Sequence, residues 1–320
     1  MSFAVREQSP DIAEKKPQLR QNDQVLTMSQ TLLVTGATGL LGPPLVRHLR
    51  KAGFCVLSAG FKKQADVNFD IRDSAETARQ LKGANPDVVV HLASETSVDR
   101  CEEKPELAYD LNVRPVENLV QAISGSRTHL INLSTDQLYD GPGPHPESSA
   151  RPRNVYASSK YFAELAAARV QATNLRVNFF GKSETPGRSS LSDWILIELR
   201  AGKSINGFTD ILFSPLSIPT LSRLIEVAAV RKLPGTFNLG SREGHSKSDF
   251  AFQLAEDFGL PLNLIRRAES ASASTSLRAY RPKDMRMDVS LFERSFNTSL
   301  PTLSEEIHSL RSTHDYEAEA

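Results

Sequence analysis

Short apolar runs alternate with longer amphipathic stretches along the first part of the chain, from about residue 30 to about residue 180. A strand-like run followed by a helix-like stretch, repeated several times, is typical of a parallel sheet covered by helices on both faces. We therefore predict an α/β fold with a doubly wound parallel sheet. The predicted strands cover residues 31–35, 54–59, 88–92, 130–133 and 175–180, and the predicted helices run from the first strand to residue 52 and over residues 74–81, 105–123 and 155–172.

The pattern changes at both ends of this region. After about Gly181 the alternation gives way to stretches that contain Gly, Pro and Ser, which predicts a smaller C-terminal lobe on the carboxyl edge of the sheet. Residues 1–29 are too polar to bury the apolar surface that ordering requires, so we expect a disordered arm there. The predicted organisation is an arm (1–29), a main domain (30–180), a lobe with elements that return to the main domain (181–312) and a flexible tail (313–320).

Composition narrows the class of protein. The 38 basic side chains balance the 38 acidic ones, so net charge gives no general attraction to nucleic acid or to a membrane surface. No apolar run approaches the roughly 18 residues of a membrane span, and residues 1–29 contain no apolar signal-peptide core. The two cysteines, Cys55 and Cys101, lack metal-ligand spacing. We therefore expect a cytoplasmic protein with no metal site and no nucleic-acid or membrane partner.

The first candidate site follows the first predicted strand. The segment Thr35-Gly-Ala-Thr-Gly-Leu-Leu-Gly42 has the GxxGxxG spacing, at the start of a predicted helix. Backbone N–H groups and the helix dipole at such a place hold a pyrophosphate, and glycine is needed because a Cβ would block the approach. The strand before and the helix after make the motif specific. We predict a Rossmann-type NAD(P)-binding domain with the cofactor on this loop, at Gly36, Thr38 and Gly42.

The end of the second predicted strand indicates which cofactor binds. Sites that prefer NAD usually carry an acidic residue about 20 positions after the glycine loop, on the ribose 2′-hydroxyl. Here the strand ends Ser58-Ala-Gly-Phe-Lys-Lys63, with two lysines and no acid. Because a lysine point charge suits a 2′-phosphate, we predict NADPH, held by Lys62 and Lys63. NADH is the alternative if both lysines are solvated loop charges.

A second motif, Tyr156-Ala-Ser-Ser-Lys160, lies in the last predicted helix of the main domain. The two side chains are one helical turn apart, so the ammonium lies near the phenol. A free phenol titrates near about pH 10, and a neighbouring positive charge moves its pKa toward neutral pH. We predict that Tyr156 exchanges a proton with a carbonyl oxygen while hydride moves at the carbon, and that Lys160 also reaches the nicotinamide ribose.

A polar cluster, Ser134-Thr-Asp136, ends an apolar predicted strand. Open α/β sheets bind their ligands at the carboxyl ends of strands. Thr135 is therefore the candidate donor to the reacting carbonyl oxygen. The alternative is that Ser134 and Thr135 only cap the following turn.

Together these motifs resemble the dTDP-4-dehydrorhamnose reductase branch of the extended short-chain dehydrogenases, from about Thr31 to about Leu310. The similarity also includes residues 91–99, 105–112, 134–141 and 281–288, and Glu164 behind the Tyr-Lys pair. The resemblance implies NADPH-dependent reduction of the 4-keto group of a nucleotide-activated 6-deoxysugar, as in dTDP-rhamnose biosynthesis, by a homodimer. It implies Thr135, Tyr156 and Lys160 as the catalytic set, Gly39, Leu40 and Leu41 along the pyrophosphate, Asp70 and Ile71 at the adenine, Ala93 and Ser94 at the inner edge of the cofactor, and Asp136 facing the sugar.

Some positions depart from the family pattern, and they concern the substrate. Family members usually have an alanine run where this chain reads Leu92-Ala-Ser94, and a Trp where it reads Asn178-Phe-Phe-Gly181. Phe179 supplies the same stacking surface or packs in the core. The candidate substrate residues besides Thr135 and Asp136 are Asn178, Phe179 and Arg281. Trp194 has helical spacing with apolar neighbours and is better explained by packing.

Three other functions share parts of this pattern. Related sugar-nucleotide 4,6-dehydratases carry Ser-Thr-Asp-Glu, because elimination of water needs a carboxylic acid beside a carboxylate; the amide of Gln137 argues against this reaction. A sugar-nucleotide epimerase uses the same catalytic groups with tightly held NAD and stays open, although Lys62 and Lys63 favour an exchangeable NADPH. A non-catalytic NADP-binding regulatory subunit resembling that of methionine adenosyltransferase also stays open, because its glycine loop and second strand read much like those of this chain.

Overall fold

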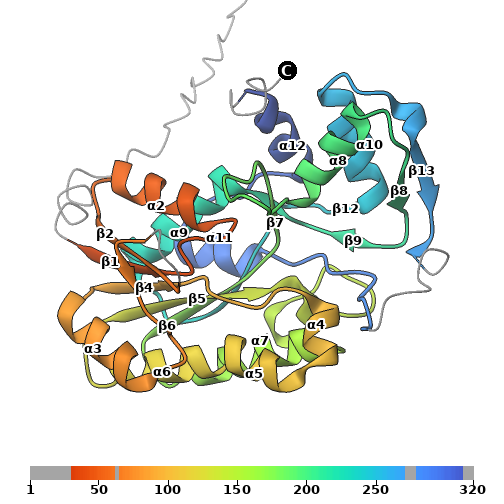
Figure 1. Cartoon of the computed structure of the whole chain (residues 1–320). Coiled ribbons are helices and arrows are strands. Elements are labelled where there is room, and N and C mark those ends of the chain that lie inside the picture. Colours follow the sequence, from red (N-terminus) through yellow and green to blue (C-terminus); the bar gives the residue numbers. More distant parts are fainter. Residues whose placement is uncertain (1–29, 62–64, 271–278, 313–320) are drawn as a thin grey trace, which may run out of the picture.

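A computed structural model of the chain describes residues 30–61, 65–270 and 279–312. Its centre is a seven-stranded sheet in which all neighbouring strands are parallel, which confirms the predicted doubly wound α/β architecture (Figure 1). The strand order reverses beside β1, and open α/β sheets bind ligands at the carboxyl ends of strands beside such a switch point. From one edge to the other, the strands are β11 (Gly235–Leu239), β6 (Ala172–Val177), β5 (His129–Thr135), β4 (Val88–His91), β1 (Thr31–Thr35), β2 (Cys55–Gly60) and β3 (Val67–Asn68).

Several predictions concern residues outside the described ranges. These are the arm over residues 1–29, the tail over residues 313–320 and the cofactor role of Lys62 and Lys63. Among the described helices, none combines the length and the apolar character needed to cross a membrane.

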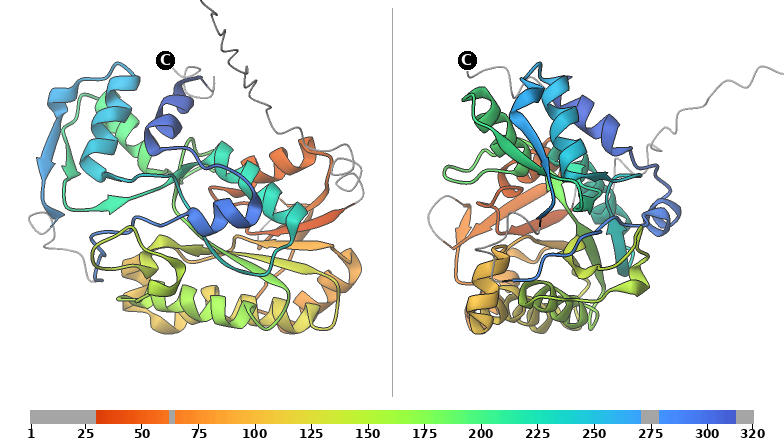
Figure 2. Two further views of the ribbon diagram at one scale, coloured as in Figure 1. Left: turned by 180° about the vertical axis from the view of Figure 1, so that it is seen from behind. Right: turned by 90° about the vertical axis from the view of Figure 1, so that its right-hand side faces the viewer.

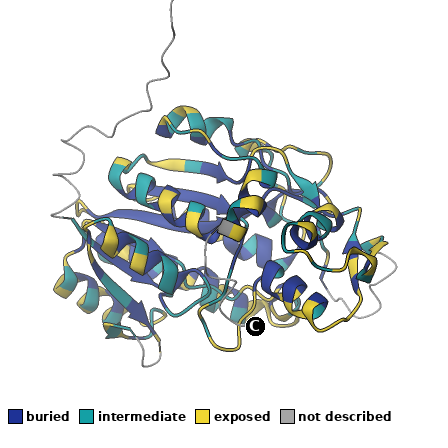
Figure 3. Ribbon diagram, turned by 90° about the horizontal axis from the view of Figure 1, so that it is seen from above, coloured by how far each residue is buried: buried dark blue, intermediate teal, exposed yellow. Residues whose placement is uncertain are grey.

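Helices cover both faces of the sheet, because successive strand side chains point to opposite faces and both sets are apolar. Leu32 belongs to the hydrophobic cluster on one face and its neighbour Leu33 to the cluster on the other. Seen from above, the central strands of the sheet are buried, and most exposed residues lie on helices and loops (Figure 3). One face carries α2 (Gly42–Lys51), α9 (Ile218–Arg231) and α11 (Ser290–Phe296), and the other carries α3 (Ser74–Ala84), α6 (Arg114–Ile123) and α7 (Val155–Ala167).

A third hydrophobic cluster lies beyond the carboxyl edge of the sheet, among later segments (Figure 2). Phe250 is at its centre, with its ring edge against Phe180 and Phe213. The segments α9, β11 and α11 return from this region to the main sheet. The elements around the third cluster are α8 (Leu191–Arg200), α10 (Lys247–Asp257), α12 (Leu303–Ser312) and the strand pairs β8 (Ile205–Phe208) with β13 (Ile265–Ala268), β9 (Leu212–Phe213) with β12 (His245–Ser246) and β7 (Phe179–Phe180) with β10 (Leu216–Ser217).

The predicted single helix over residues 105–123 is wrong. The chain forms α5 (Pro105–Asn112) and α6, with a further short helix, α4 (Val98–Glu103), before them. Pro115 lies in the first turn of α6 and has no N–H to donate to the carbonyl one turn back. The two helices therefore meet at Val113 instead of running on.

The bounds of the next predicted helix are also wrong. α7 ends at Ala167, where backbone N–H groups of Arg169 and Val170 bond three residues back. β6 (Ala172–Val177) then begins inside the predicted helix, because the chain pairs there with β5. The strand predicted over residues 175–180 is therefore also wrong, since its last two residues form β7, which belongs to another sheet. Pairing inside a sheet outweighs the weak local preference of these residues.

Candidate active site

The three predicted catalytic side chains come together at the carboxyl end of β5. Thr135 is the last residue of this strand, and α7 brings Tyr156 and Lys160 against it; all three are buried. The helix begins just before Tyr156 because the Asn154 side chain caps it, accepting a hydrogen bond from the Ala157 N–H. The Thr135 hydroxyl lies near the Tyr156 phenol and acts to lower its pKa. A hydroxyl pair beside a buried ammonium can bind a carbonyl oxygen and deliver a proton to it.

The protonation states of this pair favour proton donation. Burial raises the pKa of Tyr156, and the neighbouring Thr135 hydroxyl only partly offsets that rise. The prediction that Lys160 moves the pKa of the phenol toward neutral pH is wrong in this structure, because desolvation of the phenolate dominates. Burial lowers the pKa of Lys160 to about 8, and the charge of Glu164 acts in the opposite direction. At neutral pH the phenol is therefore neutral and the amine is charged.

Asp136 lies beside Thr135, as the resemblance implies. Burial raises its pKa to about 6, while hydrogen bonds from Asn178 and Thr135 and the charge of Lys247 lower it. The Asn178 Nδ2 group donates to Oδ2 at 2.6 Å, and the Thr135 hydroxyl donates to Oδ1 at 3.4 Å. Asn178, predicted as a substrate residue, thus holds the carboxylate in place. Lys247 comes from the first turn of α10, so this carboxylate also faces the C-terminal elements.

The predicted cofactor loop joins β1 to α2 and carries Gly36, Thr38, Gly39, Leu40, Leu41 and Gly42. Gly36 has a φ of +70°, and a Cβ there would lie 2.5 Å from the Ala93 nitrogen. A Cβ on Gly42 would lie 2.2 Å from the Ala37 oxygen, so only glycine permits this turn. Helix α2 starts without a side-chain cap and without an acidic residue in its first turn. Its N-terminus therefore fits a pyrophosphate, since nothing on the helix already neutralises the dipole.

The predicted adenine and inner-edge residues flank this loop. Asp70 follows β3, and its carboxylate is paired with Arg72, whose guanidinium lies 5.7 Å over the Phe61 ring. The Ile71 carbonyl next to it accepts a hydrogen bond from α6. Ala93 lies directly against the glycine loop, because a Cβ on Gly36 would be only 2.5 Å from the Ala93 nitrogen. The structure thus places both predicted pairs around the carboxyl ends of β3 and β4.

Ser94, in the loop after β4, is linked through Asn112 to α7, the helix that carries Tyr156 and Lys160. Its hydroxyl donates to the Asn112 side chain at 2.8 Å, and the Asn112 amide donates to the Ser159 hydroxyl at 2.8 Å. Ser159 lies immediately before Lys160 on α7. A shift of the loop after β4 would therefore be transmitted to the residue that carries the ammonium.

The remaining predicted substrate residues lie at the border between the sheet and the C-terminal elements. Phe179 is partly buried and packs against the core of the main sheet. Arg281 pairs with Asp99 at 2.9 Å, and its second Nη atom is buried without a hydrogen-bond partner among the described residues. The packing role predicted for Trp194 is wrong, since this side chain is 43% exposed.

Two cavities adjoin these residues. One, of about 480 Å³, is lined by Trp194, Phe208, Lys247 and Arg266 among others, and Lys247 connects it electrostatically to Asp136. The larger, of about 580 Å³, borders Thr38 on the α2 side, away from the phenol. Its two arginines are already paired, Arg47 with Glu184 and Arg50 with Asp66, so it adds no argument for a 2′-phosphate. In the part of the chain that the structure describes, no cluster of three or more His, Cys, Asp or Glu residues could hold a metal ion.

Sequence reasoning missed one group of this site and left the role of another undecided. His91 ends β4, bonds Thr35 through Nδ1 at 2.7 Å and has a buried Nε2 without a partner among the described side chains. Burial and the charge of Lys160 lower its pKa to about 3, so the ring is neutral. The strand-end rule that selects Thr135 would also have selected His91. Lys247 was a candidate substrate residue that surface charge explained equally well, and only the packing of α10 brings it to Asp136.

This arrangement is that of the extended short-chain dehydrogenases. The chain belongs to the family described as RmlD substrate binding domain, whose model matches residues 30–314, and this is the dTDP-4-dehydrorhamnose reductase family. The resemblance inferred from the sequence motifs is thereby confirmed.

Individual relatives differ in what they are described to do. A probable low-salt glycan biosynthesis reductase (Agl14) of Haloferax volcanii is 29% identical over 289 residues, with 87% of this chain and 96% of that protein covered. The methionine adenosyltransferase 2 subunit beta of Xenopus laevis is 27% identical, with 85% and 84% covered. A crystal structure of dTDP-4-dehydrorhamnose reductase from Bacillus anthracis in complex with NADP has a TM-score of 0.79 at 22% identity and covers 88% of this chain and 98% of that one. Structural likeness at that identity concerns the fold.

Proposed function

We propose that this protein reduces the 4-keto group of a nucleotide-activated 6-deoxysugar with NADPH. The observation that carries the proposal is the burial of a neutral Tyr156 phenol beside the Thr135 hydroxyl, one turn from the charged Lys160. A neutral phenol is the form needed to protonate the alkoxide that arises when a ketone accepts hydride. Both a glycan biosynthesis reductase among the relatives and the dTDP-4-dehydrorhamnose reductase of the same fold support this reaction class.

When bound, NADPH supplies the hydride. The N-terminus of α2 and the glycine loop would hold its pyrophosphate, and Lys160 would bind the nicotinamide ribose. Thr135 fixes the substrate oxygen and stabilises its developing charge, and Tyr156 donates the proton. Lys62 and Lys63 are the proposed 2′-phosphate ligands, on the sequence argument alone.

The 480 Å³ cavity is the proposed place of the nucleotide part of the substrate. Trp194 and Phe208 offer aromatic surfaces for a base, and Lys247 and Arg266 offer charge for a diphosphate. Lys247 is also close enough to Asp136 for its charge to lower the pKa of that carboxyl group. A ligand anchored in this cavity would therefore direct its sugar toward the Thr135–Tyr156 pair. Arg281, with one Nη atom that has no hydrogen-bond partner among the described residues, lies on the same border.

A second candidate function, that of a regulatory subunit, follows from the relatives described as methionine adenosyltransferase 2 subunit beta. A protein similar over 85% of this chain is described as a subunit of methionine adenosyltransferase. A chain of this kind would bind NADPH and a protein partner without turning over a sugar nucleotide. The two functions differ in turnover, so one assay separates them.

The test is incubation of the purified full-length protein with NADPH and a dTDP-4-keto-6-deoxysugar. We expect loss of the nicotinamide absorbance together with a product two hydrogens heavier by mass spectrometry. An isomeric product without net consumption of NADPH would show an epimerase instead. NADPH binding without any product would overturn the proposal and favour the regulatory subunit.

A further inference from the structure

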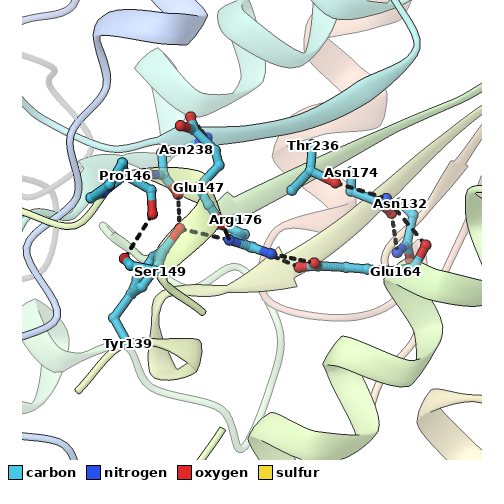
Figure 4. A network of polar contacts seen from close by, with 10 residues as sticks. All are labelled: Asn132, Tyr139, Pro146, Glu147, Ser149, Glu164, Asn174, Arg176, Thr236 and Asn238. Atoms are coloured by element: carbon cyan, nitrogen blue, oxygen red, sulfur yellow. Dashed lines mark hydrogen bonds and ion pairs between the residues drawn. The ribbon is translucent and has the colours of Figure 1, made fainter. Parts of the chain in front are cut away.

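A buried ion pair joins α7, the helix that carries Tyr156 and Lys160, to β6 (Figure 4). Arg176 on β6 contacts Glu164 on α7 through two hydrogen bonds, Nε to Oε1 at 2.9 Å and Nη2 to Oε2 at 2.6 Å. Both side chains are 4% exposed. Such a pair gives little net stability compared with apolar side chains of similar size, because both charges lose their hydration. Stability alone therefore does not account for it.

The other nitrogen of the same guanidinium binds a different segment. Arg176 Nη1 donates to the Tyr139 hydroxyl at 2.8 Å and to the Glu147 carbonyl at 2.6 Å, and the guanidinium lies 5.4 Å from the centre of the Tyr139 ring. Tyr139 directly follows η1 (Asp136–Leu138), the single turn that continues from Thr135. The Tyr139 hydroxyl in turn donates to Asn238 on β11. One arginine thus joins the segment that carries Thr135 to the helix that carries Tyr156.

Glu164 is also placed to act on the ammonium. Tyr156, Lys160 and Glu164 follow one another at intervals of one turn on α7, so they lie along one side of the helix. Arg176 occupies both carboxylate oxygens, and among the described residues no hydrogen bond joins this carboxylate to Lys160. The negative charge therefore supports the protonated amine without drawing it away from the phenol.

We propose that Arg176 is a positioning residue for the Tyr-Lys pair, resting on the proposed reductase function. Arg176 prevents Glu164 from forming an ion pair with the Lys160 ammonium. Through Tyr139 it also holds the Thr135 segment in a fixed position relative to α7. Without the guanidinium, Glu164 would be a buried unpaired carboxylate, and Lys160, one turn away, is the cation it would bind.

The charges around Lys160 determine the pH readout. The titratable groups facing the ammonium are Glu164 from α7 and His91 from β4, with Tyr156 one turn before it; Cys101 from α4 and Asp136 from η1 face the phenol. Of these, Glu164 favours the charged amine, whereas burial disfavours it. Removal of the Glu164 charge therefore lowers the pKa of Lys160 and moves the basic limb of the rate profile to lower pH.

The experiment is a double-mutant cycle of Arg176→Met and Glu164→Gln in the full chain, with kcat for the dTDP-4-keto-6-deoxysugar and the Kd for NADPH measured by fluorescence titration. We expect Arg176→Met to lower kcat tenfold to about a hundredfold, since a misplacement of about 1 Å costs up to that much, and to weaken NADPH binding. The added Glu164→Gln should restore several-fold of both, because no carboxylate is left to capture Lys160. Arg176→Lys keeps the positive charge but cannot donate to both Glu164 oxygens in the planar geometry of a guanidinium. Its kcat and NADPH affinity should therefore lie between those of wild type and Arg176→Met.

A matched control is Glu306→Gln, which alters another buried carboxylate, one that binds Ser217 and Thr220 far along the chain from α7. It should lower the thermal stability and leave the basic limb of kcat where it is, whereas Glu164→Gln should shift that limb to lower pH. A double mutant no better than Arg176→Met in both kcat and NADPH affinity, with an unshifted limb in Glu164→Gln, would reduce the pair to a structural role. If wild type lacks turnover, the NADPH titrations still decide this point separately from the proposed function.

Discussion

Tyr156 carries the most direct test of the proposed chemistry. Replacement by Phe removes the hydroxyl and leaves the ring in its cluster with Val98, Cys101 and Ala108. We expect turnover to fall by about two to four orders of magnitude, because the alkoxide loses its proton donor, with unchanged NADPH affinity and melting temperature. Steady-state kinetics and thermal unfolding check this, with the exposed Tyr109→Phe as the control. Retention of most activity in Tyr156→Phe would exclude the proton-donor role.

Residues that belong to one local motif were predictable, and residues joined by tertiary packing were not. Tyr156 and Lys160 are one helical turn apart in any helix, so their proximity follows from spacing alone. The proximity of Asp136 to Lys247 depends on how α10 packs against the end of β5, which no local pattern reports. The pKa of Tyr156 was predicted in the wrong direction for the same reason, since the degree of burial is a property of the whole fold.

Among the elements, the turn between β1 and α2 depends most on one residue. In Gly36→Ala the new Cβ would meet the Ala93 backbone at 2.5 Å in a left-handed conformation, so we expect a loss of more than about 1 kcal/mol of stability and much weaker NADPH binding. Gly83→Ala in α3 is the control, because a Cβ there meets nothing within 4 Å and should stabilise the helix by about 0.5–1 kcal/mol. Chemical denaturation and NADPH titration measure both. Normal NADPH binding by Gly36→Ala would contradict this account of the loop.

The apolar centres of the strands were predicted better than the ends of strands and helices, for a physical reason. The strands at the centre of a parallel sheet are apolar on both faces, so each appears as a continuous run, and β1 begins and ends where the pattern places it. Helix ends depend on single residues and on neighbouring segments. Pro115 divides α5 from α6, and the pairing of Ala172 with Leu130 on β5 shortens α7.

At the scale of the whole molecule, contacts across long sequence separations complete the site. Arg281 joins α4 through Asp99, and the Tyr280 carbonyl accepts a hydrogen bond from Asn154 at the start of the catalytic helix. These contacts span more than a hundred residues of chain. The sequence therefore predicts the reductase chemistry and the cofactor loop, while the surroundings of the sugar follow only from the packed molecule.

Stability of the whole molecule should fall as the pH is lowered. Burial lowers the pKa of His91 to about 3 and that of His129 to about 4, while both titrate near about 6.5 when unfolded. The unfolded chain then binds more protons from about pH 6.5 down to pH 4, so each histidine costs on the order of 3 kcal/mol at pH 4. Asp136 opposes them, because its folded pKa of about 6 lies above the unfolded value and its protonation stabilises the native state by on the order of 2 kcal/mol. We expect these three groups together to cost about 4 kcal/mol between pH 7 and pH 4, and carboxylates whose pKa is lowered in the folded state, such as Asp284, to add to that loss. Urea unfolding at both pH values measures the change. His129→Gln should make this dependence shallower and Asp136→Asn should make it steeper. Equal stability at the two pH values would mean that these groups are not buried in solution as the structure places them.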